Sequence, residues 1–411
     1  MAVNHPFMHI KTRLFGIRRI WRPLAVGCRH LHRTSAAMAD KKLFTPGPLG
    51  TSETVKQAML RDLGSRDLEF ISIIKKIRAG LLDAAGVSSA DFTVVPMQGS
   101  GTFAVESVFQ TACNRENSQV LCISSGAYGA RLGRICEVMG LRHQVLSFPE
   151  DGSVDPARVE AALRANPSTT MVAIVHCETS SGIINDVITV GKTVKAIIPD
   201  CDVFVDGMSS FGAVPLDVGA GQVDYLVSSA NKCLQGVPGF AYIIARLSKL
   251  QKCKGNSRSL SLDAYDQWDN LERTSQFRFT PPTHTMLAFS QAMEEFQLEG
   301  GVQGRAARYK ENCTVLKAGM REIGFKEFLA PHHDGYIITS FCFPKHKNFN
   351  FNTFYTKLNE RDQVIYPGKV LNAECFRIGN IGHLFPADVR HLLGCIQEVC
   401  KEMDIPLPIT E

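Results

Sequence analysis

The feature that most constrains the fold is a regular alternation of short apolar runs with helical patterns between Asp91 and about Arg246. The apolar runs have the length of buried strands, and the segments between them repeat apolar residues at helical spacing. Because neighbouring parallel strands need long, usually helical crossovers, this order predicts an α/β fold with a mainly parallel, seven-stranded sheet and helices on both faces. The expected strands are 92–96, 119–123, 143–148, 170–176, 202–206, 223–228 and 240–245, and the expected helices between them are 102–112, 129–139, 156–165 and 187–198.

A smaller α/β domain is expected in the C-terminal part of the chain. A polar stretch follows residue 250, and a long helical pattern then covers about 284–323. We therefore expect an N-terminal arm and a large domain over 39–295, followed by a small domain over 296–411. In the small domain the patterns predict strands at 336–343 and 374–378 and helices at 350–360 and 386–402.

The first 39 residues differ in charge from the remainder of the chain. They contain seven Lys and Arg and no acidic residue, whereas the formal net charge of the whole chain is +5. Residues 40–411 therefore carry −2, which offers no electrostatic basis for binding nucleic acid. Basic, Leu-, Ile-, Phe- and Trp-containing leaders that end in Ser and Ala are typical of mitochondrial transit peptides. We expect residues 1–38 to direct the chain to the mitochondrial matrix and to be removed, the alternative being a basic arm that stays attached.

Composition argues against two further classes of protein. No run approaches the ~20 apolar residues of a membrane span, so no membrane association is expected. The 13 Cys are scattered without CxxC pairs, which favours reduced, mostly buried thiols over a disulfide framework. His and Cys also lack metal-ligand spacing, so no metal site is expected.

Ligands of open α/β sheets bind beyond the carboxyl ends of the strands, so the residues that directly follow each predicted strand are the candidates for chemistry. The first such segment, Gln98-Gly99-Ser100-Gly101-Thr102, opens a helix. Small residues and hydroxyls at a helix N-terminus suit a phosphate, because the backbone N–H groups can approach it closely. A simple turn with an N-cap would have the same sequence.

Two charged residues follow later strands. Asp206 ends a buried apolar strand, where a carboxylate is costly without a partner; a protonated ring nitrogen of a cofactor would be one. Lys232 follows the next strand among small residues, and desolvation there would lower its pKa and favour imine formation. Taken singly, Asp206 could be a turn or N-cap residue and Lys232 a solvated lysine. Their order after the Gly-Ser-Gly-Thr turn is more specific than either alone.

Together these motifs resemble the class V aminotransferases of the pyridoxal-phosphate (PLP) fold type I. The resemblance runs from Lys42 to Met403 and is greatest to the group that acts on 2-aminoethylphosphonate and pyruvate. Further matching segments are Leu43–Leu49 with its Pro-Gly-Pro loop, Ser125–Gly129, His176–Gly182, Phe279–Thr283 and Cys375–Gly379.

The resemblance implies the role of each site residue. Lys232 would form the Schiff base with PLP and act as the catalytic base, and Asp206 would hold the pyridine nitrogen. Tyr128 and Met208 would pack on opposite faces of the ring, and Thr179, or else Ser180, would bond the phenolic oxygen. The phosphate would be held by Ser100, Gly101, Thr102 and Asn231 and, across a homodimer, by Thr280 and Thr283 of the other copy; Gly47 and Arg377 would bind substrate.

The implied reaction is transfer of an amino group from 2-aminoethylphosphonate to pyruvate, giving phosphonoacetaldehyde and alanine. A dianionic phosphonate needs cationic partners, for which Arg377, Arg66 and Arg131 are candidates. Alanine–glyoxylate or serine–pyruvate transamination is the closest alternative. A cysteine-desulfurase-like lyase would need a Cys on a mobile loop, and the candidates Cys342 and Cys375 lie in predicted strands. A non-enzymatic PLP-binding protein is a third class, which the presence of both Lys232 and Asp206 disfavours.

Overall fold

Seven strands form the central sheet of this protein, for which a computed structural model describes residues 40–114, 116–333, 335–370 and 373–410. The strand order is β2-β10-β9-β8-β5-β3-β4, and β10 is antiparallel to both of its neighbours while the other pairs are parallel. All seven predicted strands are present in it, so the mainly parallel sheet is confirmed. They are β2 (Phe92–Gln98), β3 (Gln119–Ser124), β4 (Arg142–Ser147), β5 (Met171–Val175), β8 (Asp202–Asp206), β9 (Tyr225–Ser229) and β10 (Phe240–Arg246).

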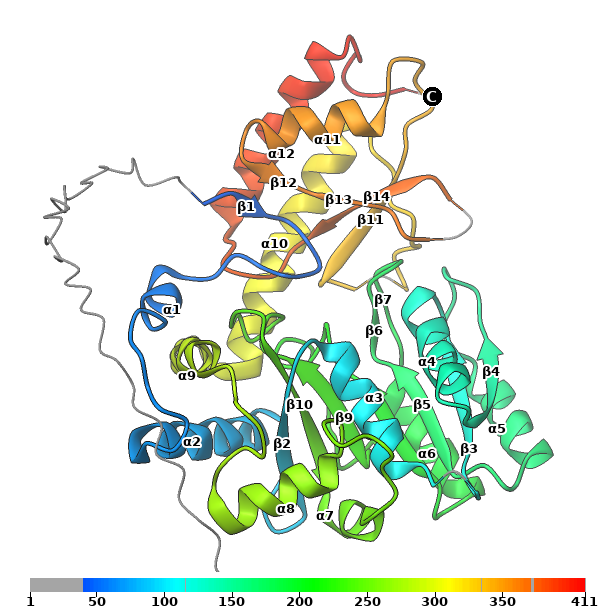
Figure 1. Cartoon of the computed structure of the whole chain (residues 1–411). Coiled ribbons are helices and arrows are strands. Elements are labelled where there is room, and N and C mark those ends of the chain that lie inside the picture. The colour runs from blue at the N-terminus through cyan, green and yellow to red at the C-terminus, as the bar shows by residue number, and fades with distance from the viewer. Residues whose placement is uncertain (1–39, 115, 334, 371–372, 411) are drawn as a thin grey trace, which may run out of the picture. The chain divides into compact units, whose positions relative to one another are not determined.

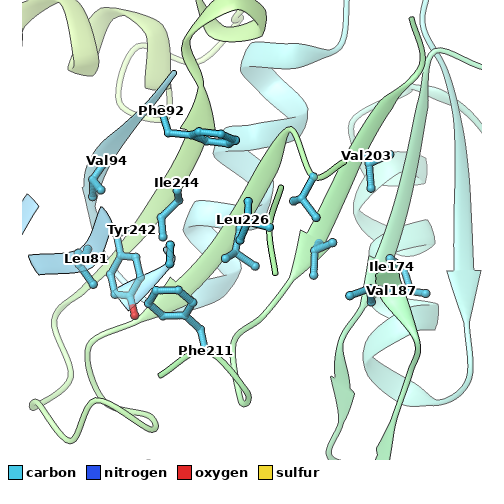
Figure 2. Packing of buried hydrophobic residues seen from close by; sticks show 14 of the residues in the cluster. Leu81, Phe92, Val94, Ile174, Val187, Val203, Phe211, Leu226, Tyr242 and Ile244 are labelled. Carbon is cyan, nitrogen blue, oxygen red and sulfur yellow. The ribbon is translucent and has the colours of Figure 1, made fainter. Parts of the chain in front are cut away.

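Helices cover both faces of this sheet (Figure 1), and alternate residues of each strand face opposite cores. In β5, Val172 and Ile174 pack in one core, and Met171 and Ala173 pack in the other. Figure 2 shows part of the first core, to which the neighbouring strands β5, β8 and β9 contribute Ile174, Val203 and Leu226. Helices α2 (Leu68–Ala84), α5 (Pro156–Ala165), α6 (Val187–Ile197) and α9 (Thr283–Leu298) cover the first core, and α3 (Gly101–Ala112) and α4 (Ala127–Val138) cover the second.

A second, three-stranded antiparallel sheet has the order β11-β14-β13. Its strands β11 (Ile338–Cys342), β13 (Tyr366–Pro367) and β14 (Cys375–Gly379) pack with α10 (Gly301–Ile323), α11 (Phe351–Asn359) and α12 (Pro386–Glu402) around a third core. The first strand of the described residues, β1 (Lys42–Leu43), pairs in parallel with β12 (Gln363–Val364), so the segment before the large sheet is attached to this C-terminal part.

The prediction of one long helical segment over 284–323 was wrong in detail, because the structure has two helices there. Gly300 and Gly301 separate α9 from α10 with φ values of +97° and +64°. A right-handed helix cannot continue through left-handed backbone, which glycine adopts without steric cost. The adjacent Gly-Gly pair was the signal for this break.

The remaining elements are short or polar, and the apolar patterns did not predict them. Helix α8 (Ala264–Thr274) lies in the polar stretch after residue 250, and the side chain of its N-cap residue, Asp263, accepts a hydrogen bond from the N–H of Asp266. The other short elements are α1 (Glu53–Gln57), β6 (Cys177–Glu178), β7 (Ile183–Ile184), α7 (Leu247–Leu250) and the 3-10 helix Gln251–Cys253.

Two predictions about organisation are not tested. The expected leader, residues 1–38, lies outside the described residues. Residues 40–411 form one compact unit, so a division near residue 296 stays a prediction. None of the helices in the described part of the chain is both long and apolar enough to span a bilayer.

Candidate active site

A cavity of about 240 Å³ lies beyond the carboxyl ends of β2, β8 and β9. Strands β2, β9 and β8 run in the same direction, so their following residues meet at one edge of the sheet. The residues predicted to bind the cofactor and found in the cavity wall are Ser100, Gly101, Thr102, Tyr128, Thr179, Asp206, Met208, Asn231 and Lys232.

The N-terminus of α3 forms one wall of the cavity. Ser100 is the residue before the helix, and Gly101 and Thr102 are its first two residues, whose N–H groups have no partner within the helix. A Cβ atom at position 101 would lie 2.2 Å from both Cε and Sδ of Met208, so a larger residue there would force that flexible side chain to move. Because Gly101 has no side chain and lines the cavity, an anion could approach the backbone N–H groups of this helix end closely.

Asp206 ends β8 and is 9% exposed. One carboxylate oxygen accepts a hydrogen bond of 2.9 Å from the N–H of Met208, and the other has no hydrogen-bond partner among the described residues. Burial raises the pKa of Asp206 to about 6, against the opposing effects of the Met208 N–H and of Lys232 and Arg131. A cationic donor in the cavity would therefore stabilise the charged form of this carboxyl.

Lys232 lines the same cavity and follows β9. Its Nζ atom donates a hydrogen bond of 2.5 Å to the carbonyl oxygen of Pro46. Burial lowers the pKa of Lys232, although the surrounding acidic groups, including Asp206, act in the other direction. Gly47, the predicted substrate-loop glycine, contacts the same side chain and has φ +122°.

Glu178 is a buried residue that the predictions missed, although it stands inside a quoted motif. Its Oε2 accepts hydrogen bonds of 3.0 Å from the N–H groups of both Tyr128 and Gly129, at the start of α4. Its Oε1 accepts from the N–H and the hydroxyl of Ser180, at 3.2 and 2.6 Å. Glu178 thus holds the first turn of α4, and with it Tyr128, against the β6-β7 hairpin.

The hydroxyl groups of Thr179 and Ser180, which are neighbours in the β6-β7 hairpin, have different surroundings. Thr179 lines the cavity and hydrogen-bonds the side chain of Tyr128. Ser180 is not among the cavity-lining residues, and its hydroxyl is engaged by Glu178 and by the N–H of Ala127. The cofactor contact predicted for one of them stays a prediction, for which Thr179 has the better position.

Arg377 of β14 is 5% exposed and lies behind Thr179, outside the cavity wall itself. Its Nε donates to the carbonyl oxygen of Pro367 at 3.0 Å, and its Nη1 donates to that of Thr179 at 2.8 Å. Two backbone carbonyls thus fix the guanidinium and leave its Nη2 edge for a ligand.

Thr280 and Thr283 are not brought to this cavity. Thr280 is exposed and lines a different cavity of about 350 Å³ together with Arg66, and Thr283 begins α9. Their predicted contact with the phosphate of a second copy is not tested. Of the arginines considered for a phosphonate, Arg131 lines the first cavity and Arg66 does not.

Another residue that the predictions missed is Lys369, two residues after β13. Its Nζ atom lies 4.2 Å from the centroid of the Tyr128 ring. Nothing in the local sequence marks it, because the contact depends on how the small sheet packs against α4.

The residues of the cavity fit PLP. An acceptor for a ring nitrogen (Asp206), an amine for the aldehyde (Lys232) and a helix N-terminus for the phosphate (Gly101) surround one space, and Tyr128 offers a ring for stacking. No group of three or more His, Cys, Asp or Glu side chains in the described ranges could hold a metal ion.

The chain belongs to the class V aminotransferase family, whose model matches residues 51–367. Two curated relatives are 2-aminoethylphosphonate–pyruvate transaminases. That of Syntrophobacter fumaroxidans is 48% identical over 358 residues, covering 87% of this chain and 95% of the relative. That of Phocaeicola vulgatus is 47% identical over 361 residues, covering 87% and 99%.

Solved structures of lower identity share the fold. The pyridoxamine–pyruvate aminotransferase of Mesorhizobium loti is 22% identical with a TM-score of 0.81, over 90% of this chain and 94% of that chain. The alanine–glyoxylate aminotransferase of Nostoc is 22% identical with a TM-score of 0.79, over 93% and 98%. The architecture is that of the fold-type I PLP enzymes, as expected.

Proposed function

We propose that this protein is a PLP-dependent aminotransferase that transfers the amino group of 2-aminoethylphosphonate to pyruvate, forming phosphonoacetaldehyde and alanine. The observation that carries the choice of substrates is the identity of 46–48% to transaminases of that name over 95–99% of their length. The meeting of Asp206, Lys232 and the α3 N-terminus in one cavity supports the cofactor.

Each wall of the cavity would hold one part of PLP. Asp206 would pair with the protonated ring nitrogen, and its buried carboxylate would keep that proton in place. The α3 N-terminus with Ser100 and Thr102, and Asn231, would hold the phosphate. When bound, PLP supplies an aldehyde that accepts the amine and a ring that withdraws electrons from the reacting carbon.

Lys232 has two tasks in this reaction. It would hold the cofactor through the aldehyde of PLP, and its amine would be freed when the amino group of the substrate takes that place. The freed Nζ, whose pKa burial lowers, can then accept the proton from the donor carbon. The carbonyl oxygen of Pro46, at 2.5 Å, orients this amine inside the cavity.

Arg377 would bind the carboxylate of pyruvate. Its guanidinium is fixed by the carbonyl oxygens of Pro367 and Thr179, so its free edge has a defined direction. A planar guanidinium can make paired hydrogen bonds to a carboxylate, which Lys cannot reproduce.

Alanine–glyoxylate or serine–pyruvate transamination is the alternative on the same residues. The desulfurase-like lyase has less support, because Cys342 and Cys375 lie in the paired strands β11 and β14 and not on a loop.

A homodimer, with Thr280 and Thr283 completing the partner's phosphate site, belongs to the proposal. We also propose that residues 1–38 direct the protein to mitochondria and are then removed. Detection of residues 1–33 on the mitochondrial protein would contradict this removal.

The deciding experiment offers single amino donors to the PLP-loaded protein and follows the cofactor spectrum. We expect 2-aminoethylphosphonate to convert the aldehyde form to the amine form, and pyruvate to restore it with alanine as product. Conversion by alanine or serine without conversion by the phosphonate would overturn the proposed donor.

A further inference from the structure

Positive charges gather around Tyr128, one of the residues that line the cavity. The Nζ of Lys369 lies 4.2 Å from the ring centroid, and the guanidinium carbon of Arg131 lies 4.8 Å from it. Burial alone would raise the pKa of Tyr128, yet Lys369, Lys232 and Arg377, with a hydrogen bond from Thr179, bring this pKa below its usual value. The side chains of four cations, Lys369, Arg131, Lys232 and Arg377, therefore lie near the side chain of Tyr128.

Carboxylates do not balance this charge. Neither Lys369 nor Arg377 makes an ion pair with any acidic residue in the part of the chain that the structure describes. Glu178 accepts four hydrogen bonds from α4 and Ser180, and Asp206 interacts electrostatically with Lys232 and Arg131, so these two carboxylates stand against four cationic side chains. The surroundings of Tyr128 thus have excess positive charge.

Arg377 alone suits a carboxylate better than a phosphonate. Two of its nitrogens each donate to a backbone carbonyl, which leaves one edge and a single positive charge. A carboxylate has two oxygens and one charge. A fully ionised phosphonate has three oxygens and two charges, so it requires a further donor with a positive charge.

Lys369 is placed to be that donor, because its backbone is tied to the strand that carries Arg377. Tyr366 of β13 pairs with Arg377, and the N–H of Gly368 donates to the carbonyl oxygen of Cys375 at 2.9 Å. A Cβ atom at Gly368 would lie 2.1 Å from that oxygen, so the close approach requires glycine. Lys369 follows directly, and its flexible side chain reaches Tyr128.

We propose that Lys369 is a substrate-binding residue that, together with Arg377, holds the phosphonate of the amino donor and is not needed for the carboxylate of the 2-oxo acid. This inference rests on the proposed function. It gives one cavity two modes of binding, because the two substrates of the reaction occupy it in turn with different anionic groups.

The test compares Lys369→Gln and Lys369→Arg with the exposed-loop control Lys347→Gln in the PLP-loaded protein. Binding of the unreactive 2-hydroxyethylphosphonate and of lactate is measured by calorimetry, and the two half-reactions are measured separately by absorbance. We expect Lys369→Gln to weaken phosphonate binding and to raise the half-saturation for 2-aminoethylphosphonate by about tenfold, with lactate and pyruvate unchanged. Lys369→Arg should retain most of the binding, and Lys347→Gln should match the parent.

Equal losses for phosphonate and carboxylate in Lys369→Gln, or no loss for either, would overturn the role of Lys369. A parent protein that does not bind 2-hydroxyethylphosphonate would overturn it as well. The proposed donor fails separately, if the parent binds this phosphonate but is not converted by 2-aminoethylphosphonate.

Discussion

A Cβ atom on Gly47 would lie 2.5 Å from the Nζ atom of Lys232, so the N-terminal loop leaves room for the lysine only because position 47 is glycine. The loop also provides the acceptor for that lysine through the carbonyl oxygen of Pro46. The N-terminal segment is therefore part of the candidate active site and not only an attachment to the small sheet.

Replacement of this glycine should disturb the lysine directly. Gly47→Ala places a Cβ against Lys232 and forces φ +122° on a residue that resists it, at a cost of about 1–3 kcal/mol. We expect weaker retention of PLP and loss of the absorption band of the lysine-bound cofactor. Gly50→Ala is the matched control, because nothing lies within 4 Å of its Cβ. An unchanged band in Gly47→Ala would contradict the close contact.

The charge of Asp206 should reduce the stability of the cofactor-free protein at neutral pH. Its pKa is raised to about 6 in the folded state, against about 3.9 in an unfolded chain. The folded state thus holds the proton more tightly, and stability falls as pH rises from about 4 to about 6. Above that range the penalty is full, and two pKa units correspond to about 3 kcal/mol.

We therefore expect Asp206→Asn to raise the free energy of unfolding of the PLP-free protein at pH 8, and the gain to shrink steadily as the pH falls from about 6 toward about 4. Urea titrations across this range measure the difference. A gain independent of pH would argue against a buried, titrating carboxylate. With PLP present the same variant should bind the cofactor more weakly, because the partner of the ring nitrogen is lost.

Glu178 should matter for stability through the start of α4. In Glu178→Gln an amide group replaces one carboxylate oxygen, so two of the four donors lose their acceptor, at a cost of about 1–3 kcal/mol. Urea denaturation would measure this loss. Asp155→Asn is the control, because Asp155 caps α5 at an exposed site and Asn is an equally good N-cap. Equal effects of both substitutions would show that burial of Glu178 is unimportant.

Two helical glycines should respond in opposite ways to alanine. A Cβ at Gly191 of α6 would lie 1.9 Å from the carbonyl oxygen of Gly221, so Gly191→Ala must move backbone and should destabilise the fold by about 1–3 kcal/mol or more. A Cβ at Gly394 of α12 meets nothing within 4 Å, so Gly394→Ala should stabilise by up to about 1 kcal/mol. Thermal or urea unfolding of the two variants tests the sign of each change.

Much of the architecture could be predicted from local patterns. Buried strands such as β5 and β8 are continuous apolar runs, and the parallel order of the sheet follows from the helices between them. The polar helix α8 escaped prediction because its sequence has few apolar residues to form a pattern. The break between α9 and α10 needed attention to two glycines within an otherwise helical pattern.

The sequence by itself determined which residues stand at the strand ends, since Asp206, Lys232 and the turn at Ser100–Thr102 follow runs that must be buried. Only the tertiary structure decided that Glu178 holds Tyr128, that Gly47 touches Lys232 and that Lys369 lies over the Tyr128 ring. These contacts join segments far apart in the chain. They depend on how loops pack against one another, which no local periodicity encodes.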